Sequence, residues 1–212
     1  MAREQPPNIL EIFRDFVKVG READFREVEE DAARICAEMS FPHHHIAIES
    51  LSPPQEVWWL NGFASEAEIQ QVRDDYARNP SLVAALGGIG RRREGLTEPP
   101  VDVFATYRPD LSRGATWRIA GSRFFIVTVT AEDPPTGGSV FEAPDGPRFV
   151  FRPAGTRAEA DALAAREPVG ARIFAVRPYW GMPAKEWIAA DPEFWKENPA
   201  ALSSRGGPER RP

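Results

Sequence analysis

The sequence predicts an α+β protein with mainly antiparallel sheets, and three observations support this prediction. Segments rich in β-branched and aromatic residues, as strands are, outnumber segments with helical spacing. Several neighbouring strand segments are separated by turn residues alone, as in antiparallel hairpins. Strand segments also carry apolar or aromatic residues on both faces, which indicates sheets that are covered on both sides.

The first strand and helix are the clearest elements. Residues 9–19 are rich in β-branched and aromatic side chains and end at Gly20, which predicts a strand. Residues 21–39 predict a helix, because their apolar side chains recur at three- and four-residue spacing. Pro42 prevents this helix from continuing.

Two paired strands and a second helix follow. Residues 44–50 and 56–63 predict strands joined by a proline-containing turn. Ser65 is a favourable N-cap for the next helix, and Glu68 stands at the capping-box spacing from it. A short extension restarts after Asn79-Pro80.

We expect that extension to end at Gly87-Gly88, because paired glycines disfavour a helix interior. The run Arg91-Arg92-Arg93 then falls in a solvated loop, and residues 101–108 form a fourth strand. The order β-α-β-β-α-β over residues 9–108 is that of a split βαβ, or ferredoxin-like, unit.

The second half repeats this plan without its first helix. Strands are expected at 124–131, 139–143, 148–152 and 171–178, with the middle pair turning at Asp145-Gly146. Thr156 is expected to cap a helix that runs through Arg166. The prediction is therefore of tandem ferredoxin-like halves, one over residues 1–112 and a reduced one over residues 113–180.

Residues 181–212 are expected to form a helical tail. Short helices are predicted at 184–190 and 192–197, with Asp191 capping the second one and Pro192 in its first turn. The tail carries three large aromatic residues, which we expect to pack on the body or on a partner subunit.

Composition and charge exclude several classes of protein. The net charge is −6, which argues against a nucleic-acid partner. The single cysteine, Cys36, excludes an intrachain disulfide, and it falls on the apolar face of a helix as a core residue would. No apolar run approaches the length of a membrane span, so we expect a cytoplasmic protein without a membrane partner.

The segments ILEIFRDFVKVG, READF, VWWLNGF and SEAEI give the first half a recognisable layout. In layout and texture it resembles the dimeric α/β-barrel superfamily, which includes antibiotic-biosynthesis-monooxygenase-like and NIPSNAP-like proteins. The resemblance implies two ferredoxin-like sheets that face each other and close a barrel, within one chain or between chains. It also implies a homodimer or higher homo-oligomer.

The resemblance implies an enzyme that binds a small molecule, such as a cofactor-independent monooxygenase or a related catalyst. We therefore expect no cofactor. One alternative is a non-catalytic ligand-binding or assembly protein on the same barrel. The cofactor-free oxygenases of the superfamily hold an aromatic substrate in an aromatic pocket with Asn and Arg groups. Here Asn61 and Arg108 are candidates for catalysis, and Trp59 and Tyr107 for binding the ligand. Trp59 and Asn61 share a strand face, whereas Tyr107 and Arg108 point to opposite faces.

The three histidines are consecutive. His43 and His45 share one face of an extended segment, so they could hold a metal ion with Glu49 as a third ligand, as a metal-dependent enzyme would require. Alternatively His45 performs acid/base work, or the run is a hydrated strand entrance. Arg177 and Trp180 close the last strand and are further candidates for ligand binding at a barrel mouth.

Overall fold

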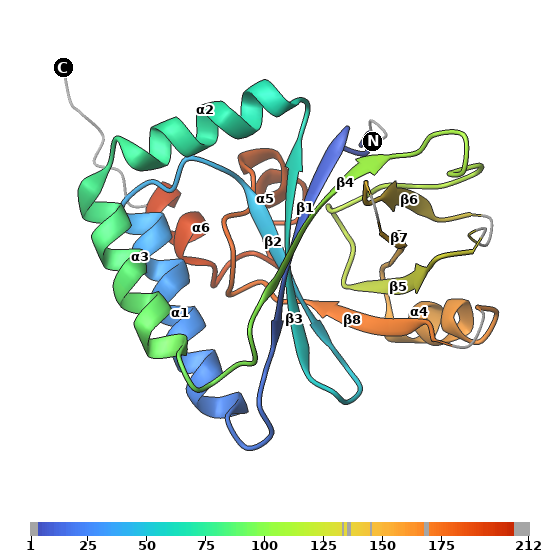
Figure 1. Cartoon of the computed structure of the whole chain (residues 1–212), viewed down its shortest axis with the longest axis horizontal. Helices are drawn as coiled ribbons and strands as arrows, with labels where there is room; N and C mark the ends of the chain where they lie inside the picture. The colour runs from blue at the N-terminus through green and yellow to red at the C-terminus, as the bar shows by residue number, and fades with distance from the viewer. Residues whose placement is uncertain (1–3, 133, 135–136, 145, 168–169, 206–212) are drawn as a thin grey trace.

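The computed structural model describes residues 4–132, 134, 137–144, 146–167 and 170–205. These residues form eight strands and six helices (Figure 1). The strands are β1 (Ile9–Phe16), β2 (His45–Ser50), β3 (Glu56–Phe63), β4 (Val101–Tyr107), β5 (Phe124–Thr130), β6 (Ser139–Glu142), β7 (Arg148–Ala154) and β8 (Arg172–Val176). The helices are α1 (Glu22–Glu38), α2 (Glu66–Ala77), α3 (Pro80–Arg93), α4 (Arg157–Ala164), α5 (Lys185–Ala190) and α6 (Pro199–Arg205).

The eight strands form one closed barrel in the order β1-β3-β2-β8-β5-β7-β6-β4. Every paired neighbour is antiparallel. The first four strands lie in the order β4-β1-β3-β2 and the last four in the order β8-β5-β7-β6, which is the same arrangement used twice. The quartets join where Ile48 pairs with Val176 and where Thr106 pairs with Glu142. The expected α+β class is confirmed, and the barrel closes within a single chain.

Aromatic side chains fill the middle of the barrel. Trp58 lies at the centre of this core, and its ring contacts the rings of Phe149, Phe151 and Phe174. Leu10, like Trp58, is almost fully buried there. Because strand side chains alternate, the residues between these interior positions point outward, toward the helices.

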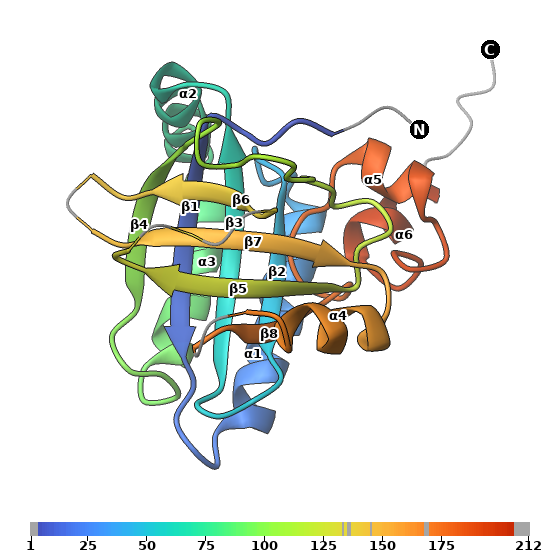
Figure 2. The same ribbon diagram turned by 90° about the vertical axis from the view of Figure 1, so that its right-hand side faces the viewer.

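Helices cover the outside of the barrel unequally (Figures 1 and 2). The helices α1, α2 and α3 lie over the outer face of the first quartet, and α1 packs against α3. On the second quartet, α4 lies along one side and contacts β5, β7 and β8, and no helix lies over β6 in Figure 2. Among the described residues between β5 and β6 there is no helix, as the sequence order predicted.

The predicted helix starts agree with the observed caps. The hydroxyl of Ser65 accepts a hydrogen bond from the backbone N–H of Glu68 at 3.3 Å, and that of Thr156 accepts one from Glu159 at 3.2 Å. The side chain of Asn79 caps α3 by accepting from the N–H of Leu82. Asp145, in the expected hairpin turn, lies outside the described residues.

The expected end of α3 at Gly87-Gly88 is wrong. The helix continues to Arg93, so the arginine run lies in its last turn. Each helical glycine costs up to about 1 kcal/mol relative to alanine. Contacts with α1 offset this cost, because Ile89 packs against Val28 and Ala32.

The tail also departs from expectation. The helix predicted at 192–197 is absent, since that segment forms turns, and α6 begins instead at Pro199. Asn198 provides the helix start, as its side-chain oxygen accepts from the N–H of Ala200. Asp191 follows α5 and pairs with Arg123 at 2.7 Å. Trp195 is fully buried in the barrel core cluster, so the tail packs on the body.

Candidate active site between the sheet and the helices

Three polar side chains form a row across the outer face of the first quartet. In the sheet register Glu11 of β1 lies opposite Asn61 of β3, and Asn61 lies opposite His45 of β2. Directly opposed residues in a sheet have their Cβ atoms about 5 Å apart. The next row holds Phe13, Trp59 and Ala47, which gives the polar row an apolar and aromatic neighbour.

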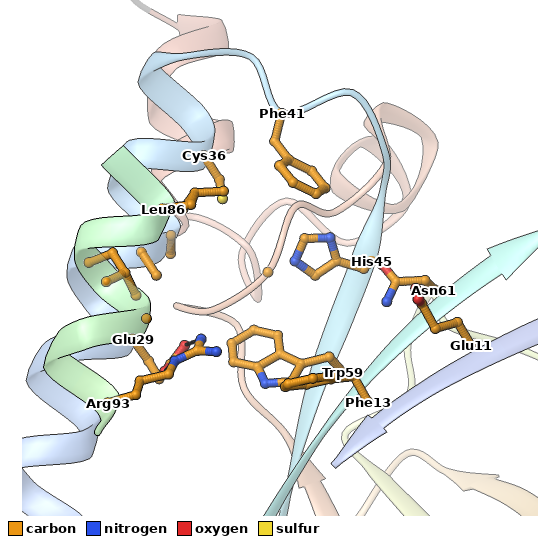
Figure 3. A pocket seen from close by; sticks show the side chains of 15 residues that line it. Glu11, Phe13, Glu29, Cys36, Phe41, His45, Trp59, Asn61, Leu86 and Arg93 are labelled. Carbon is orange, nitrogen blue, oxygen red and sulfur yellow. Dashed lines mark hydrogen bonds and ion pairs between the residues drawn. The ribbon is translucent and has the colours of Figure 1, made fainter. Parts of the chain in front are cut away.

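A cavity of about 310 Å³ lies between these rows and the helices (Figure 3). The sheet supplies the polar row, together with Phe13 and Trp59. The helical wall comes from α1 and α3 and is mostly apolar, with Phe41 at one end. Its residues are Glu29, Ala32, Ala33, Cys36, Leu86, Ile89, Gly90 and Arg93. Concave, mainly apolar sites with a few converging polar groups are typical of small-molecule binding.

His45 is the imidazole that faces this cavity. It is buried, and its ring centroid lies 5.5 Å from that of Phe41 and 5.9 Å from that of Trp59, both in edge-on arrangements. Burial lowers the pKa of His45 to about 3, so the ring is neutral at pH 7. Its Nδ1 atom is buried without a hydrogen-bond partner among the described residues. This nitrogen is therefore an unsatisfied polar atom in the wall of the cavity.

Glu11 is the carboxyl group of the polar row. Burial raises its pKa to about 7, the nearby charge of Asp102 adds to this effect, and Arg73 opposes it. A carboxyl group with a pKa near 7 can both accept and donate a proton at neutral pH. Glu11 also borders an adjoining hollow of about 240 Å³ beneath α2.

A network of buried charges forms the floor of the cavity. Arg93 holds both carboxylate oxygens of Glu29, which is fully buried on α1. The same guanidinium lies 3.9 Å from Asp15 and 5.7 Å from the centroid of the Trp59 ring. The indole N–H of Trp59 donates to Asp15 at 3.1 Å. The network fixes the position of Trp59.

Burial raises the pKa values of Glu29, to about 7, and of Asp15. Arg93 acts against both increases. In turn the two carboxylates raise the pKa of Arg93, so the guanidinium stays charged. Burial also raises the pKa of the Cys36 thiol to about 12, which makes it a poor nucleophile at neutral pH.

Of the residues predicted from the sequence, the cavity brings together His45, Trp59 and Asn61. Trp180 lies next to it, with its ring centroid 6.3 Å from that of Trp59. Glu29, Arg93, Glu11 and Asp15 were not predicted. For Glu11 and Asp15, the alternation with Phe13 is a signal that could have indicated two acidic groups on one strand face.

The other candidates lie elsewhere. Tyr107 packs against Phe141 at the barrel core, and Arg108 pairs with Asp110 and Glu142. Neither residue lines the cavity. Arg177 pairs with Glu49, a buried carboxylate that also pairs with Arg26.

His43 lies in a bend before β2 and lines a different cavity from His45, which is the first residue of that strand. His43 stacks on Phe63, and its ring centroid lies 4.3 Å from that of Phe63. Within the described residues, no group of three His, Cys, Asp or Glu side chains is placed to hold a metal ion. Nor does any described helix have the length and apolar character of a membrane span.

Neither a family model nor a curated relative matches this chain. Solved structures match it at low similarity. An anthrone oxidase-like protein has a TM-score of 0.48 and 11% identity, over 80% of this chain and 92% of its own. A candidate monooxygenase from Fusobacterium nucleatum has a TM-score of 0.47 and 8% identity, over 82% and 93%. A mutant chlorite dismutase from Candidatus Nitrospira defluvii, in complex with cyanide, has a TM-score of 0.43 and 9% identity, over 91% and 96%.

Proposed function

We propose that this protein is an enzyme of the dimeric α/β-barrel type that binds a small aromatic molecule between its sheet and helices. The observation that carries the proposal is the row Glu11–Asn61–His45, in which a carboxyl, an amide and a neutral imidazole face one apolar cavity. The reaction class that we propose is proton abstraction followed by oxidation with O₂, as in a cofactor-independent monooxygenase or a related catalyst.

Each side chain of the row has a distinct role. Glu11 accepts the substrate proton, because its pKa of about 7 matches neutral pH. The amide of Asn61 donates a hydrogen bond to the oxygen on which the negative charge develops. His45 is neutral and fixes a hydroxyl or carbonyl group of the substrate through its imidazole, which lines the cavity.

The aromatic side chains hold the substrate body. Trp59 and Phe13 supply flat apolar surface on the sheet side, and Phe41 supplies it at one end of the cavity. The positive charge of Arg93 is already used by Glu29, so the cavity suits a neutral substrate better than an anion. Arg108 has no part in this proposal, because its guanidinium is paired away from the cavity.

Anthrone is a suitable test substrate, because it is flat and apolar and has an acidic CH₂ group. Conversion of this CH₂ and O₂ to a carbonyl group and water balances without an external reductant. The experiment measures anthrone binding without oxygen, then O₂ uptake and product absorbance with a chelator present. We expect binding that quenches tryptophan fluorescence and O₂ uptake above the spontaneous rate.

Variants of the row separate binding from catalysis. Glu11→Gln should lower the rate by about 10²-fold while anthrone still binds, as loss of an acid/base group does. Glu27→Gln, an exposed change on α1, serves as the matched control with unchanged rate. Binding without any turnover would reject the enzyme in favour of a non-catalytic ligand-binding protein. If anthrone neither bound nor reacted, this cavity would be rejected as a site for aromatic ligands.

A further inference from the structure

A larger cavity, of about 780 Å³, opens at one end of the barrel. Its floor consists of the interior side chains Leu10, Ile46 and Leu60, and Trp117 adds an aromatic wall. These floor residues alternate along β1, β2 and β3 with the polar row of the first cavity. The two cavities therefore lie back to back, on opposite faces of the same three strands.

The opposite end of the barrel is closed by ion pairs. Glu56, at the start of β3, pairs there with Arg14 at 2.8 Å and also with Arg172. The open mouth has no such closure, since its described lining contains neither lysine nor arginine. A volume of 780 Å³ lies within the range of sites that hold small organic molecules.

The charged groups that line this mouth are all carboxylates: Glu4, Glu68, Asp75 and Glu186. Glu4 accepts from the backbone N–H of Ala120 at 3.2 Å and also from that of Ile119, and Glu68 accepts from that of Ala64. Among the described residues, neither Glu4 nor Glu68 forms an ion pair with a cationic side chain. Asp75 is paired with Arg78, outside the cavity lining. Glu186 is exposed and has no described partner.

His43, which lines the mouth, does not offset this negative charge. His43 is partly buried, and burial lowers its pKa, so its ring is neutral at pH 7. The ring stacks flat on Phe63, at an interplanar angle of 4°, and its Nε2 atom is buried without a described partner. Trp187 provides a further half-buried ring in the lining. Aromatic faces next to unpaired carboxylates favour a cation.

We propose that the open barrel mouth is a second ligand site, which takes a small organic cation with a flat apolar body. The apolar part lies on Leu10, Leu60 and Trp117, and the cationic group lies at the rim near Glu68 and Glu186. This site is independent of the proposed oxidation, because it uses the other face of the strands. It also gives His43 and the N-terminal segment from Glu4 to Asn8 a role that the first cavity does not.

Calorimetric titration with three matched indoles tests the proposal. Tryptamine carries an ammonium group, tryptophol is its neutral counterpart, and indole-3-propionate is an anion. We expect one tryptamine per chain, with binding at least about tenfold tighter than that of indole-3-propionate and weaker at high salt. Equal binding of tryptamine and tryptophol would overturn the cation site, and absence of tryptamine binding would overturn the ligand class.

Two surface variants locate the site without disturbing the core. Glu186→Gln removes the unpaired carboxylate and should weaken tryptamine binding about threefold, as expected for one exposed charge pair. Gln71→Lys places a cation on the exposed rim of the cavity and should weaken it further. Glu27→Gln on α1 is the control and should leave the affinity unchanged. If neither rim variant changes the affinity, tryptamine binds elsewhere and the proposal fails.

Discussion

Arg93, the last residue of α3, donates through Nε and Nη2 to the two carboxylate oxygens of Glu29 on α1. The two residues are far apart in the sequence, and Glu29 is fully buried. This bidentate pair holds together the two helices that form the helical wall of the first cavity.

We predict that Arg93→Met lowers the free energy of unfolding by about 3–5 kcal/mol at pH 8, because it leaves a buried carboxylate unpaired. The double variant Glu29→Leu/Arg93→Met should regain most of this loss, since it removes the charge as well. Chemical denaturation of both variants measures the difference. A double variant as unstable as the single one would show that the pair acts through packing instead.

We predict that Glu11 makes the stability of the protein depend on pH. Its pKa in the folded chain is about 7, above the ordinary value of 4.5, so the folded state binds its proton more tightly than the unfolded state. This group therefore favours folding below about pH 4.5, and that contribution is lost as pH rises to 7. Denaturation from pH 4 to 8 should show a decline in the wild type that is smaller in Glu11→Gln. An equal decline in both proteins would exclude Glu11 as its source.

His45 should produce the opposite slope. Its folded pKa of about 3 lies below the ordinary 6.5, so the unfolded state binds the proton more tightly. The contribution of His45 to the free energy of unfolding is fully present above pH 6.5 and is lost as pH falls toward 3. NMR should show the imidazole of His45 neutral at pH 5, and His45→Gln should lose less stability than the wild type on acidification. Protonation of His45 near pH 6 would contradict the prediction.

Substitution of Gly181 tests the backbone contact between Gly181 and His45. Its φ is +80°, and an added Cβ would lie 2.8 Å from the carbonyl oxygen of His45. Gly20 has nearly the same φ, +81°, but open space around it, so it is a matched control for backbone strain. Gly181→Ala should cost more stability than Gly20→Ala and should alter the His45 resonances, whereas Gly20→Ala should not. If both substitutions lowered stability equally, the close contact between residue 181 and His45 would relax at no energetic cost, and the prediction would be wrong.

Local signals in the sequence were sufficient for most of the fold. Strand-favouring composition and the bounding turn residues placed all eight strands within a few residues, and side-chain caps at Ser65 and Thr156 set the helix starts. The extent of α3 could not be predicted, because contacts of Ile89 with α1 outweigh the local preference of Gly87 and Gly88. Tertiary packing therefore extends α3 through two glycines that, by local preference, would end it.

The candidate site was less accessible from the sequence. Alternation puts Asn61 and Trp59 on one face of a strand, but only the register between strands brings Glu11 and His45 beside Asn61. The pairing of Glu29 with Arg93 depends on how α3 packs on α1. Such long-range contacts leave no local periodicity for a sequence pattern to reveal.

Trp58 and Trp59 are adjacent residues that face opposite sides of the sheet. Each donates its indole N–H to a carboxylate, Trp58 to Glu56 at 2.8 Å and Trp59 to Asp15 at 3.1 Å. Substitution by phenylalanine removes one such bond in either case, and each should lower stability by about 1–3 kcal/mol. Only Trp59→Phe should also weaken anthrone binding, because Trp59 lines the first cavity whereas Trp58 lies in the filled barrel core. Fluorescence titration of the two variants decides the matter, since a larger loss of affinity in Trp58→Phe would place the ligand inside the barrel.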